Sequence, residues 1–447
     1  MAKDNWGNPH SHTSKTAIEA LESATLQLAA YRSDPVGTID AALKEHPDFV
    51  MGHAFRAGVF ATASDKVFEP HLRKSLRAAE PLMGKANDRE RGHIAACSAW
   101  LDGDFERATE LWGRVAIAHP RDLLAVQLAH LGDFFHGHSM MLRDRVARVL
   151  PLWNDSTPGH GFLLGMHAFG LEESGEYALA EKEGRKAVAA NGQDGWAVHA
   201  VAHVLEMEGR AEAGADWLAT TAAGWEPESL FAYHNTWHWT LFHLDRNDFT
   251  AALKLYDEKI GKDGFDQALK LVDGAALLWR LTVLGHDVGD RWASVADGWA
   301  SRAEHGYYAF NDVHAMMAFV ATGREELQSR LIATLKKTAE GFGTNAMMTR
   351  EVGLPGARGI RAFGRGAFDE AVEYLLPLRS KAQLFGGSHA QRDVISWTLV
   401  EAAIRAGDKT MAEALAAERL SPKPQSPLNL AWAKRAREIN TRKQEAS

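Results

Sequence analysis

Cysteine is nearly absent from this sequence of 447 residues, and long apolar runs are missing altogether. The single cysteine, Cys97, excludes an internal disulfide and a zinc site made of several thiolates, and its apolar helical surroundings predict a buried side chain. No apolar stretch approaches the roughly 20 residues that span a bilayer. Residues 1–12 are polar and contain no hydrophobic signal core. We therefore expect a cytoplasmic protein that does not enter a membrane.

An excess of basic charge is missing as well, because the chain has 50 Lys and Arg residues but 58 Asp and Glu residues. The net charge of -8 argues against a nucleic-acid partner, which needs a basic surface to neutralise phosphates. The sequence also lacks the GxSxG elbow, the P-loop, CxxC pairs and the HExxH zinc motif. Sustained alternation of apolar and polar residues is not found, so strands are not expected and the chain is predicted to be helical.

A recurring turn divides the chain into helical pairs. The clearest unit, residues 87–120, predicts a helix, a turn at Gly103, a second helix and a stop at Pro120. The same turn recurs at Gly175, Gly209, Asn247, Gly366 and Gly407. Each turn residue is followed five positions later by a small residue, which lets the two helices of a pair cross closely. These small residues are Ala108, Ala180, Gly214, Ala252, Ala371 and Ala412.

The repeat period identifies the fold class. The turns at Gly175 and Gly209 lie 34 residues apart, which is the period of tetratricopeptide repeats. We predict an all-α, tetratricopeptide-type α-solenoid, a right-handed superhelix of about eleven helix–turn–helix pairs that can curl around a central pocket. The predicted domains are a polar tail at 1–15, the solenoid at 16–426, and a capping helix with a tail at 427–447, the helix covering 427–443. First helices are expected at 16–31, 49–63, 89–101, 122–135, 160–173, 195–208, 231–245, 267–284, 310–321, 345–364 and 388–406.

Histidines gather on these first helices, which line the concave surface in solenoids of this type. Two neighbouring segments, HAVAHVLEME at 199–208 and YHNTWHWTLFHL at 233–244, carry the densest groups. In the first segment His199, His203 and Glu206 follow the spacing i, i+4, i+7, which places all three on one helical face. A binding site on the concave surface should show such unusual polar residues.

The second segment repeats this spacing, with His234 and His238 one turn apart and Trp237 between them. Two imidazoles one turn apart can bind zinc or iron, with a carboxylate as a third ligand. Alternatively, such rings form hydrogen bonds across repeats and no metal is involved. We predict no cofactor. In the alternative, a divalent metal, the ligand set is His199, His203, Glu206, His234 and His238.

Two more first helices contain polar residues where apolar ones are expected. Asp273 and Arg280 lie seven residues apart and therefore share a helical face. Asn311, Asp312 and His314 stand near the start of another helix. An N-cap role for Asn311 or Asp312 is the simpler explanation for that pair.

The last predicted first helix begins with Ser388 as an N-cap, followed by Gln391, Arg392 and Asp393, with Arg392 facing inward. Residues 349–356 place Gly and Pro within a predicted helix, so we expect this helix to be bent or broken. Such a break can direct backbone groups at a ligand, or it can adjust the curvature of the superhelix.

Six segments resemble the tetratricopeptide repeat protein 38 family, in the order in which that family has them. They are HAVAHVLEM, YHNTWHW, DGAALLWRL, FNDVHAMMAF, REVGLP and GGSHAQRDV. The resemblance covers at least 195–400 and extends more loosely to the N-terminal repeats. It departs from the family at Glu351, where Asp is more frequent, and at the variable His389. It implies a fold but no established reaction. The positions that it assigns to a site are His199, His203, Glu206, His234, Trp237, His238, Asp273, Arg280, Asn311, Asp312, His314, Gln391, Arg392 and Asp393.

The sequence supports two functions of different kinds. We predict a protein that binds a peptide or a small polar ligand in a concave groove rich in His and Trp, and that has neither nucleic acid nor membrane as a partner. The alternative is an enzyme whose superhelix encloses His, Asp, Glu and Arg side chains for acid–base or metal-assisted hydrolysis. A purely structural scaffold ranks third, because it does not need clustered titratable residues. A homo-oligomer is left open.

Overall fold

The computed structural model describes residues 2–439, and these are almost entirely helical. Within them, eleven helical pairs follow one another from α1–α2 to α22–α23, with α19 and α20 together forming one first helix, and α24 comes last. Neighbouring helices pack against each other in chain order, as in an α-solenoid. The predicted all-α solenoid is confirmed.

The chain divides into two compact units, and each is described by itself. Unit 1 comprises Met1–Val201 and Thr221–Ala232, and unit 2 comprises Ala202–Thr220 and Tyr233–Ser447. Three of the described helices contribute residues to both units, α11 (Gly195–Met207), α12 (Ala211–Trp225) and, with its first residue only, α13 (Ala232–Asp245).

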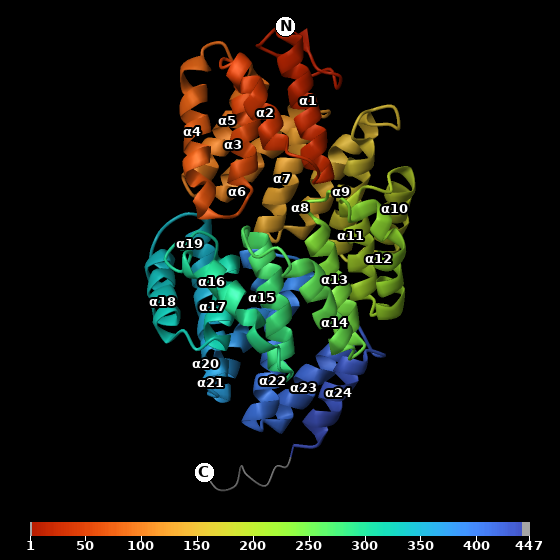
Figure 1. Cartoon of the computed structure of the whole chain (residues 1–447), viewed down its shortest axis with the longest axis vertical. Helices are drawn as coiled ribbons and strands as arrows, with labels where there is room; N and C mark the ends of the chain where they lie inside the picture. Colours follow the sequence, from red (N-terminus) through yellow and green to blue (C-terminus); the bar gives the residue numbers. More distant parts are fainter. Residues whose placement is uncertain (1, 440–447) are drawn as a thin grey trace. The chain divides into compact units, whose positions relative to one another are not determined.

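Unit 1 begins with two short antiparallel strands, β1 (Ala2–Lys3) and β2 (Pro9–His10). Its helices then run back and forth beside one another (Figure 1). They are α1 (Lys15–Ala30), α2 (Pro35–Glu45), α3 (Val50–Ala61), α4 (Glu69–Ala79), α5 (Asp88–Leu101), α6 (Phe105–Ala118), α7 (Leu123–His136), α8 (Ser139–Val149), α9 (His160–Glu173) and α10 (Tyr177–Ala190). Short 3-10 turns cover Lys66–Phe68, Glu80–Leu82 and Leu150–Leu152.

Unit 2 continues the same pattern. Its helices are α13 (Ala232–Asp245), α14 (Phe249–Leu255), α15 (Ala268–Val283), α16 (Trp292–Ala300), α17 (Ala309–Ala321), α18 (Glu325–Ala339), α19 (Thr344–Met348), α20 (Leu354–Gly364), α21 (Phe368–Leu375), α22 (His389–Ala406), α23 (Lys409–Leu420) and α24 (Pro427–Arg437). Turns of π type cover Tyr256–Ile260 and Thr349–Gly353, and 3-10 turns cover Gly289–Arg291, Leu376–Ser380 and Ala382–Phe385. The helix predicted at 427–443 ends at Arg437, and its last four residues lie outside the described part.

The turns follow the sequence prediction closely. All six predicted turn residues have positive φ angles, between 60° at Asn247 and 84° at Gly103, a conformation that glycine and asparagine adopt most easily. The small residues five positions later are all buried. At Gly214 a Cβ atom would lie 2.2 Å from the Cζ atom of Phe242, so any larger side chain would collide with that buried ring.

The N-terminal segment differs from the polar tail that we predicted. Asp4, Trp6 and His10 are buried, and the Nε1 atom of Trp6 donates a hydrogen bond to the carbonyl oxygen of Pro158 (2.7 Å). The carboxylate of Asp4 accepts hydrogen bonds from the backbone of Trp6 and Asn8, which closes the turn between β1 and β2. This segment is therefore part of the packed body of unit 1. Its polar composition reflects these hydrogen bonds.

Buried arginines in unit 1 are paired with buried aspartates. The Nε atom of Arg89 lies 2.6 Å from an Oδ2 oxygen of Asp122, and the Nε2 atom of His93 lies 2.9 Å from the same oxygen. The Nε atom of Arg145 lies 2.6 Å from the Oδ2 oxygen of Asp133. All five side chains are at most 4% exposed. Each buried cation therefore has its counter-charge within the fold.

Unit 2 departs from a simple linear stack, because α22 packs directly on α15. The Nε1 atom of Trp279 donates to the Oγ1 atom of Thr398 (2.9 Å), and the Nη2 atom of Arg405 donates to the carbonyl oxygen of Val283 (2.6 Å). In an open solenoid each repeat contacts only its neighbours. Here the last pair returns to a pair near the start of the unit, so the inner faces of these first helices are enclosed.

The helix that we expected to be bent or broken at 349–356 continues instead. A π turn at Thr349–Gly353 joins α19 to α20, so the helical run extends from Thr344 to Gly364. Pro355, which has no N–H to donate to a preceding carbonyl, is the second residue of α20, the helix that follows directly after this π turn. The wider turn absorbs the irregularity without ending the helix.

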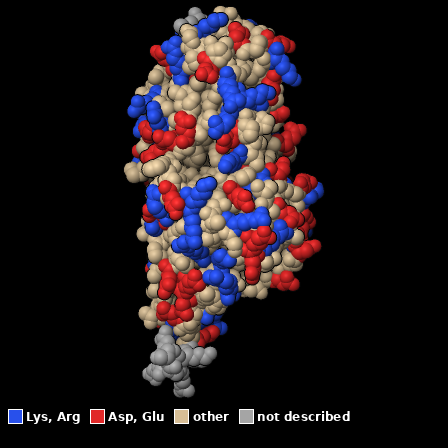
Figure 2. Space-filling model, turned by 90° about the vertical axis from the view of Figure 1, so that its left-hand side faces the viewer, with Lys and Arg blue, Asp and Glu red and all other residues tan. Residues whose placement is uncertain are grey.

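No helix within residues 2–439 is both long and apolar enough to cross a bilayer. Cys97 is fully buried, as predicted. On the face drawn in Figure 2, acidic and basic side chains are interspersed.

Candidate functional site

Arg280 is the most unusual side chain of unit 2, because it is a buried cation without a carboxylate partner. It lies in the last turn of α15 and is 1% exposed. Its Nη1 atom donates to the carbonyl oxygen of Ala276 (3.1 Å), and its Nη2 atom donates to that of Ala390 (2.7 Å). Its guanidinium carbon lies 5.4 Å from the ring centroids of both Trp237 and Trp397. Among the described residues, no carboxylate oxygen lies within 4.0 Å of its nitrogens.

The charge of Arg280 persists despite this burial. Removal from water lowers the pKa of Arg280 to about 10, while the carboxylates of Asp393 and Glu206 act in the opposite direction from a greater distance. The guanidinium is therefore protonated at pH 7. A buried charge that lacks a direct counter-ion costs several kcal/mol, and an anion bound beside it would offset that cost.

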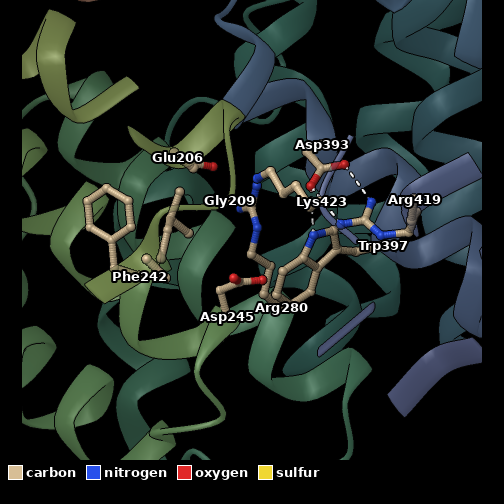
Figure 3. A pocket seen from close by; sticks show the side chains of 11 residues that line it. Glu206, Gly209, Phe242, Asp245, Arg280, Asp393, Trp397, Arg419 and Lys423 are labelled. Carbon is tan, nitrogen blue, oxygen red and sulfur yellow. Dashed lines mark hydrogen bonds and ion pairs between the residues drawn. The ribbon is translucent and has the colours of Figure 1, made fainter. Parts of the chain in front are cut away.

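A cleft opens beside Arg280, as Figure 3 shows. It comprises about 390 Å³ when its solvent-open mouth is included, and the room for the centres of water molecules is about 20 Å³. Space of that size holds one or two waters or a small ion. The lining comes from α11, α12, α13, α15, α22 and α23 and the loops that follow α11 and α23. It consists of Glu206, Gly209, Ala211, Leu241, Phe242, Asp245, Arg280, Asp393, Trp397, Arg419 and Lys423.

The nearest carboxylate on the α22 side already has its own partner. The Nη1 and Nη2 atoms of Arg419 contact the two Oδ atoms of Asp393 at 2.6 and 3.0 Å, and the Nε1 atom of Trp397 donates to Oδ2 (2.8 Å). Burial alone raises the pKa of Asp393, but Arg419 outweighs it and holds this pKa well below its usual range. The carboxylate of Asp393 is therefore neutralised by its ion pair with Arg419. Lys423 adds a further positive charge to the cleft.

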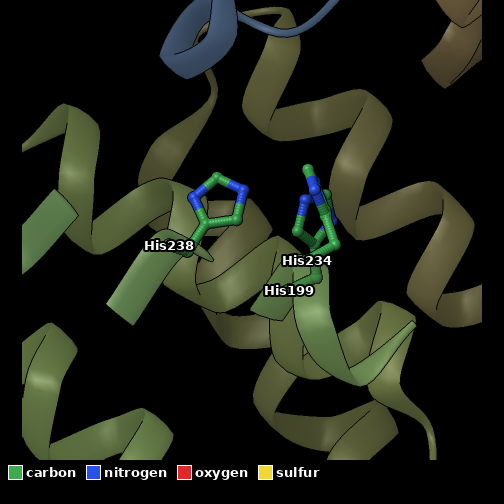
Figure 4. Close-up of side chains that lie close together, drawn as sticks. All are labelled: His199, His234 and His238. Carbon is green, nitrogen blue, oxygen red and sulfur yellow. The ribbon is translucent and has the colours of Figure 1, made fainter. Parts of the chain in front are cut away.

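Two histidine–carboxylate pairs adjoin the cleft. The Nδ1 atom of His234 lies 2.8 Å from the Oδ2 atom of Asp273, and the Nδ1 atom of His238 lies 3.2 Å from the Oε2 atom of Glu206. The rings of His234 and His238 come from one face of α13 (Figure 4), with centroids 5.0 Å apart. The ring of His203 lies 4.4 Å from that of His238. When Nδ1–H donates to a carboxylate, Nε2 keeps its lone pair.

Burial is the largest cause of the pKa shifts of Asp273 and Glu206. It raises the pKa of Asp273, which His234 and Arg280 oppose. It also raises the pKa of Glu206, which Lys423, His203 and Arg280 oppose. Glu206 is shared between the histidine pair and the cleft, since it accepts from His238 and also lines the space beside Arg280.

Other buried polar atoms around Arg280 have no hydrogen-bond partner within the described residues. They are the Oδ1 atom of Asp273, the Nε2 atom of His314 and the Nε2 atom of Gln391. The Nδ1 atom of His314 bonds to the carbonyl oxygen of Phe310 (2.8 Å), so its Nε2 atom carries the lone pair. Burial, with a smaller contribution from the charge of Arg280, lowers the pKa of His314 to about 4. Unsatisfied buried groups of this kind are rare away from ligand or water sites.

All of the predicted site residues except His199 lie in unit 2. His199 belongs to unit 1, where its ring lies 5.1 to 5.3 Å from those of Trp196, Phe231 and Phe169. Arg392 donates to the carbonyl oxygen of Gly387 and does not line the cleft. Gln391 forms a capping box with the predicted N-cap, Ser388.

The N-cap explanation for Asn311 and Asp312 is wrong. The helix α17 begins at Ala309, whose backbone N–H is bound by the Oδ1 atom of Asn345 (2.8 Å), so a distant side chain caps this helix. Asp312 is 5% exposed, and within residues 2–439 its Oδ2 atom has no hydrogen-bond partner. Burial raises the pKa of Asp312 to about 7.

Sequence reasoning missed the α22–α24 side of the cleft. Trp397 lies four residues after Asp393 and therefore on the same face of α22, a signal that could have identified it. Arg419 and Lys423 lie on and after a second helix, where no local pattern distinguishes them from surface charges. Comparison with protein-family models finds none that matches the chain.

Proposed function

We propose that unit 2 binds a small ligand through an anionic group that contacts Arg280. The observation that carries this proposal is the buried guanidinium without a carboxylate partner, which the fold stabilises only through two carbonyl groups and two tryptophan rings. Burying a charge without a counter-ion lowers the stability of the fold, and a bound anion offsets this loss. The two paired arginines of unit 1 show that the same fold class can neutralise a buried arginine internally.

The groups around Arg280 limit the chemical classes of ligand that can bind there. A guanidinium presents parallel N–H groups that match a carboxylate or a phosphate. Lys423 contributes a second positive charge, and Trp397 provides an apolar wall. The limited space favours a small ion or a short polar molecule over a peptide.

Thermal unfolding with inorganic phosphate and with acetate tests this proposal. At 100 times its Kd, a ligand adds about 2.7 kcal/mol to the free energy of unfolding, which raises the Tm by roughly 5–11 °C for a unit of this size. We expect this shift in the wild type and its loss in Arg280→Met.

The matched control is Arg405→Met. Arg405 also lies on a buried helix, donates to a carbonyl and packs on aromatic rings, but it is paired with Glu401. Phosphate stabilises many proteins by exclusion from their surface, and this general effect should be equal in both variants. Equal phosphate shifts in the wild type and in Arg280→Met would overturn the proposal.

Hydrolysis is the second candidate function, and the two histidine–carboxylate pairs favour it. A carboxylate bonded to Nδ1 orients an imidazole so that Nε2 can accept a proton from water. Glu206 links one such pair to the Arg280 cleft, where an anionic substrate would bind. Release of 4-nitrophenol from its acetate and phosphate esters provides the measurement. An enzyme requires turnover that disappears in His238→Gln, and absent or unchanged turnover would exclude this reaction class for these esters.

We also propose that the chain belongs to the tetratricopeptide repeat protein 38 family. This membership is supported by the position of the matching segments, because those that contain Trp237, Arg280, His314 and Asp393 lie close to one another in unit 2. Three of the matching segments, which contain Glu206, Arg280 and Asp393, line the same cleft although they are far apart in sequence.

A further inference from the structure

The two histidines of α13 have a geometry that neither ligand binding at Arg280 nor packing requires. Both use Nδ1 to contact a buried carboxylate, His234 with Asp273 and His238 with Glu206. Both rings are buried, at 4% and 0% exposure. Because the pairs come from three different helices, α11, α13 and α15, this arrangement is built by the tertiary structure and does not follow from local sequence.

Carboxylate–imidazole pairs of this kind serve metal sites in a specific way. The carboxylate accepts the Nδ1 proton, fixes the ring orientation and leaves Nε2 as the ligand nitrogen. It also increases the basicity of that nitrogen and supplies negative charge near the cation. Two histidines at i and i+4 on one helix place two such nitrogens on the same side.

We propose that His234 and His238 are two protein ligands of a divalent metal ion, bound through their Nε2 atoms and oriented by Asp273 and Glu206. Imidazole ligands select zinc, iron or a similar transition metal, whereas magnesium and calcium require oxygen ligands. Two histidines leave coordination positions for water or other groups, and an open position is what a catalytic metal site requires. The proposal does not depend on the anion site, because metal binding is measured without an added anion.

The burial of the orienting carboxylates supports this inference. Asp273 is fully buried and its Oδ1 atom has no hydrogen-bond partner within the described residues. Arg280, within electrostatic range, adds positive charge without forming an ion pair with it. A cation held by His234 would give the carboxylate of Asp273 additional compensation.

The experiment uses the full chain, freed of metal by a chelator and then titrated with Zn²⁺ or Co²⁺. We expect one equivalent of bound metal by elemental analysis, and visible absorption bands of Co²⁺ in a nitrogen-containing protein site. His234→Gln and His238→Gln should each abolish stoichiometric binding. Asp273→Asn should weaken the affinity by about 10- to 100-fold, because it disturbs the orientation of His234 but removes no ligand.

His243→Gln is the matched control. His243 lies on the same helix, and its Nδ1 atom also contacts a carboxylate, that of Asp248 at 3.4 Å. This pair is partly exposed, whereas His234 and His238 are buried. This variant should bind metal like the wild type. The proposal is overturned if the wild type takes up neither metal stoichiometrically, or if His234→Gln and His238→Gln bind as well as His243→Gln. Should a histidine variant fail to fold, the affinity of Asp273→Asn relative to the wild type decides the question.

Discussion

Arg89 and Arg145 in unit 1 and Arg280 in unit 2 are equally buried, yet their surroundings differ in one respect. Each of the first two has a buried aspartate within 2.6 Å, whereas Arg280 contacts only carbonyl oxygens and tryptophan rings. Burial alone therefore does not distinguish a structural arginine from one that serves a ligand. The presence or absence of an internal counter-charge does, and the following variants test that distinction.

The largest effect is expected from Asp122→Asn in unit 1. This change removes the closest counter-charge of the buried Arg89 and leaves it the more distant carboxylate of Asp4, 4.0 Å away. Breaking a buried ion pair in this way costs about 3–5 kcal/mol. The Tm should fall by roughly 6–20 °C in scanning calorimetry. Asparagine can still accept the backbone N–H of Ala125, so the N-cap of α7 is kept.

The control for this variant is Asp104→Asn. Asp104 is the exposed N-cap of α6 and accepts the backbone N–H of Arg107 in the same way. Its replacement should cost less than about 1 kcal/mol, because an asparagine cap is as good as an aspartate cap. Similar losses in both variants would show that the ion pair of Asp122 contributes little.

Two buried carboxyl groups, Asp122 of unit 1 and Asp312 of unit 2, should respond to pH with opposite signs. Arg89 and His93 outweigh the effect of burial on Asp122 and hold its pKa well below the usual range, so the stability that it contributes is lost as the pH falls. Burial raises the pKa of Asp312 to about 7. Its unfolded form ionises near pH 4, so its contribution to stability declines as the pH rises from about 4 to about 7.

Asp312→Asn should therefore stabilise the protein above pH 7. The gain in the free energy of unfolding should be on the order of 4 kcal/mol, because the pKa of Asp312 is about three units higher in the folded than in the unfolded protein. Near pH 4 the variant and the wild type should unfold at similar temperatures. Urea denaturation at pH 4.5, 6 and 8 provides the measurement. A gain that is the same at all three values would mean that the effect comes from packing and not from ionisation.

The smallest effect on stability is expected from Arg280→Met. No ion pair is lost, and methionine removes the desolvation cost while retaining an apolar contact with Trp237 and Trp397. In the absence of ligand, the Tm should change by less than about 4 °C, which corresponds to about 1 kcal/mol. If calorimetry shows a loss as large as that of Asp122→Asn, Arg280 is a structural residue and the contrast between the units disappears.

Much of the fold could be predicted because its signals are local. A helical pair is encoded by a turn residue and a small residue five positions later, as at Gly103 and Ala108, and both lie within one repeat. The N-terminal strands escaped prediction because two-residue strands carry no periodicity. The π turn escaped it because Gly and Pro signal an interruption without specifying its form.

The site was predicted in part, for a different reason. The spacing of Asp273 and Arg280 correctly placed them on one face, and the histidines of α13 were recognised from their i, i+4 pattern. The partners could not be predicted, because the contact between α15 and α22 arises from small rotations that accumulate over several repeats. For this reason Arg419 was not recognised, although it neutralises Asp393.

The contact between α15 and α22 also determines how unit 2 must fold. Three hydrogen bonds, from Trp279 to Thr398, from Arg280 to Ala390 and from Arg405 to Val283, join residues 110 to 122 positions apart. A linear array can lose its end repeats one at a time, since each depends only on its neighbour. Here the last pair stabilises a pair near the start of the unit, so its loss would loosen both ends together. Closing so long a loop is slow compared with forming local helices, and unit 2 therefore completes its cleft late in folding.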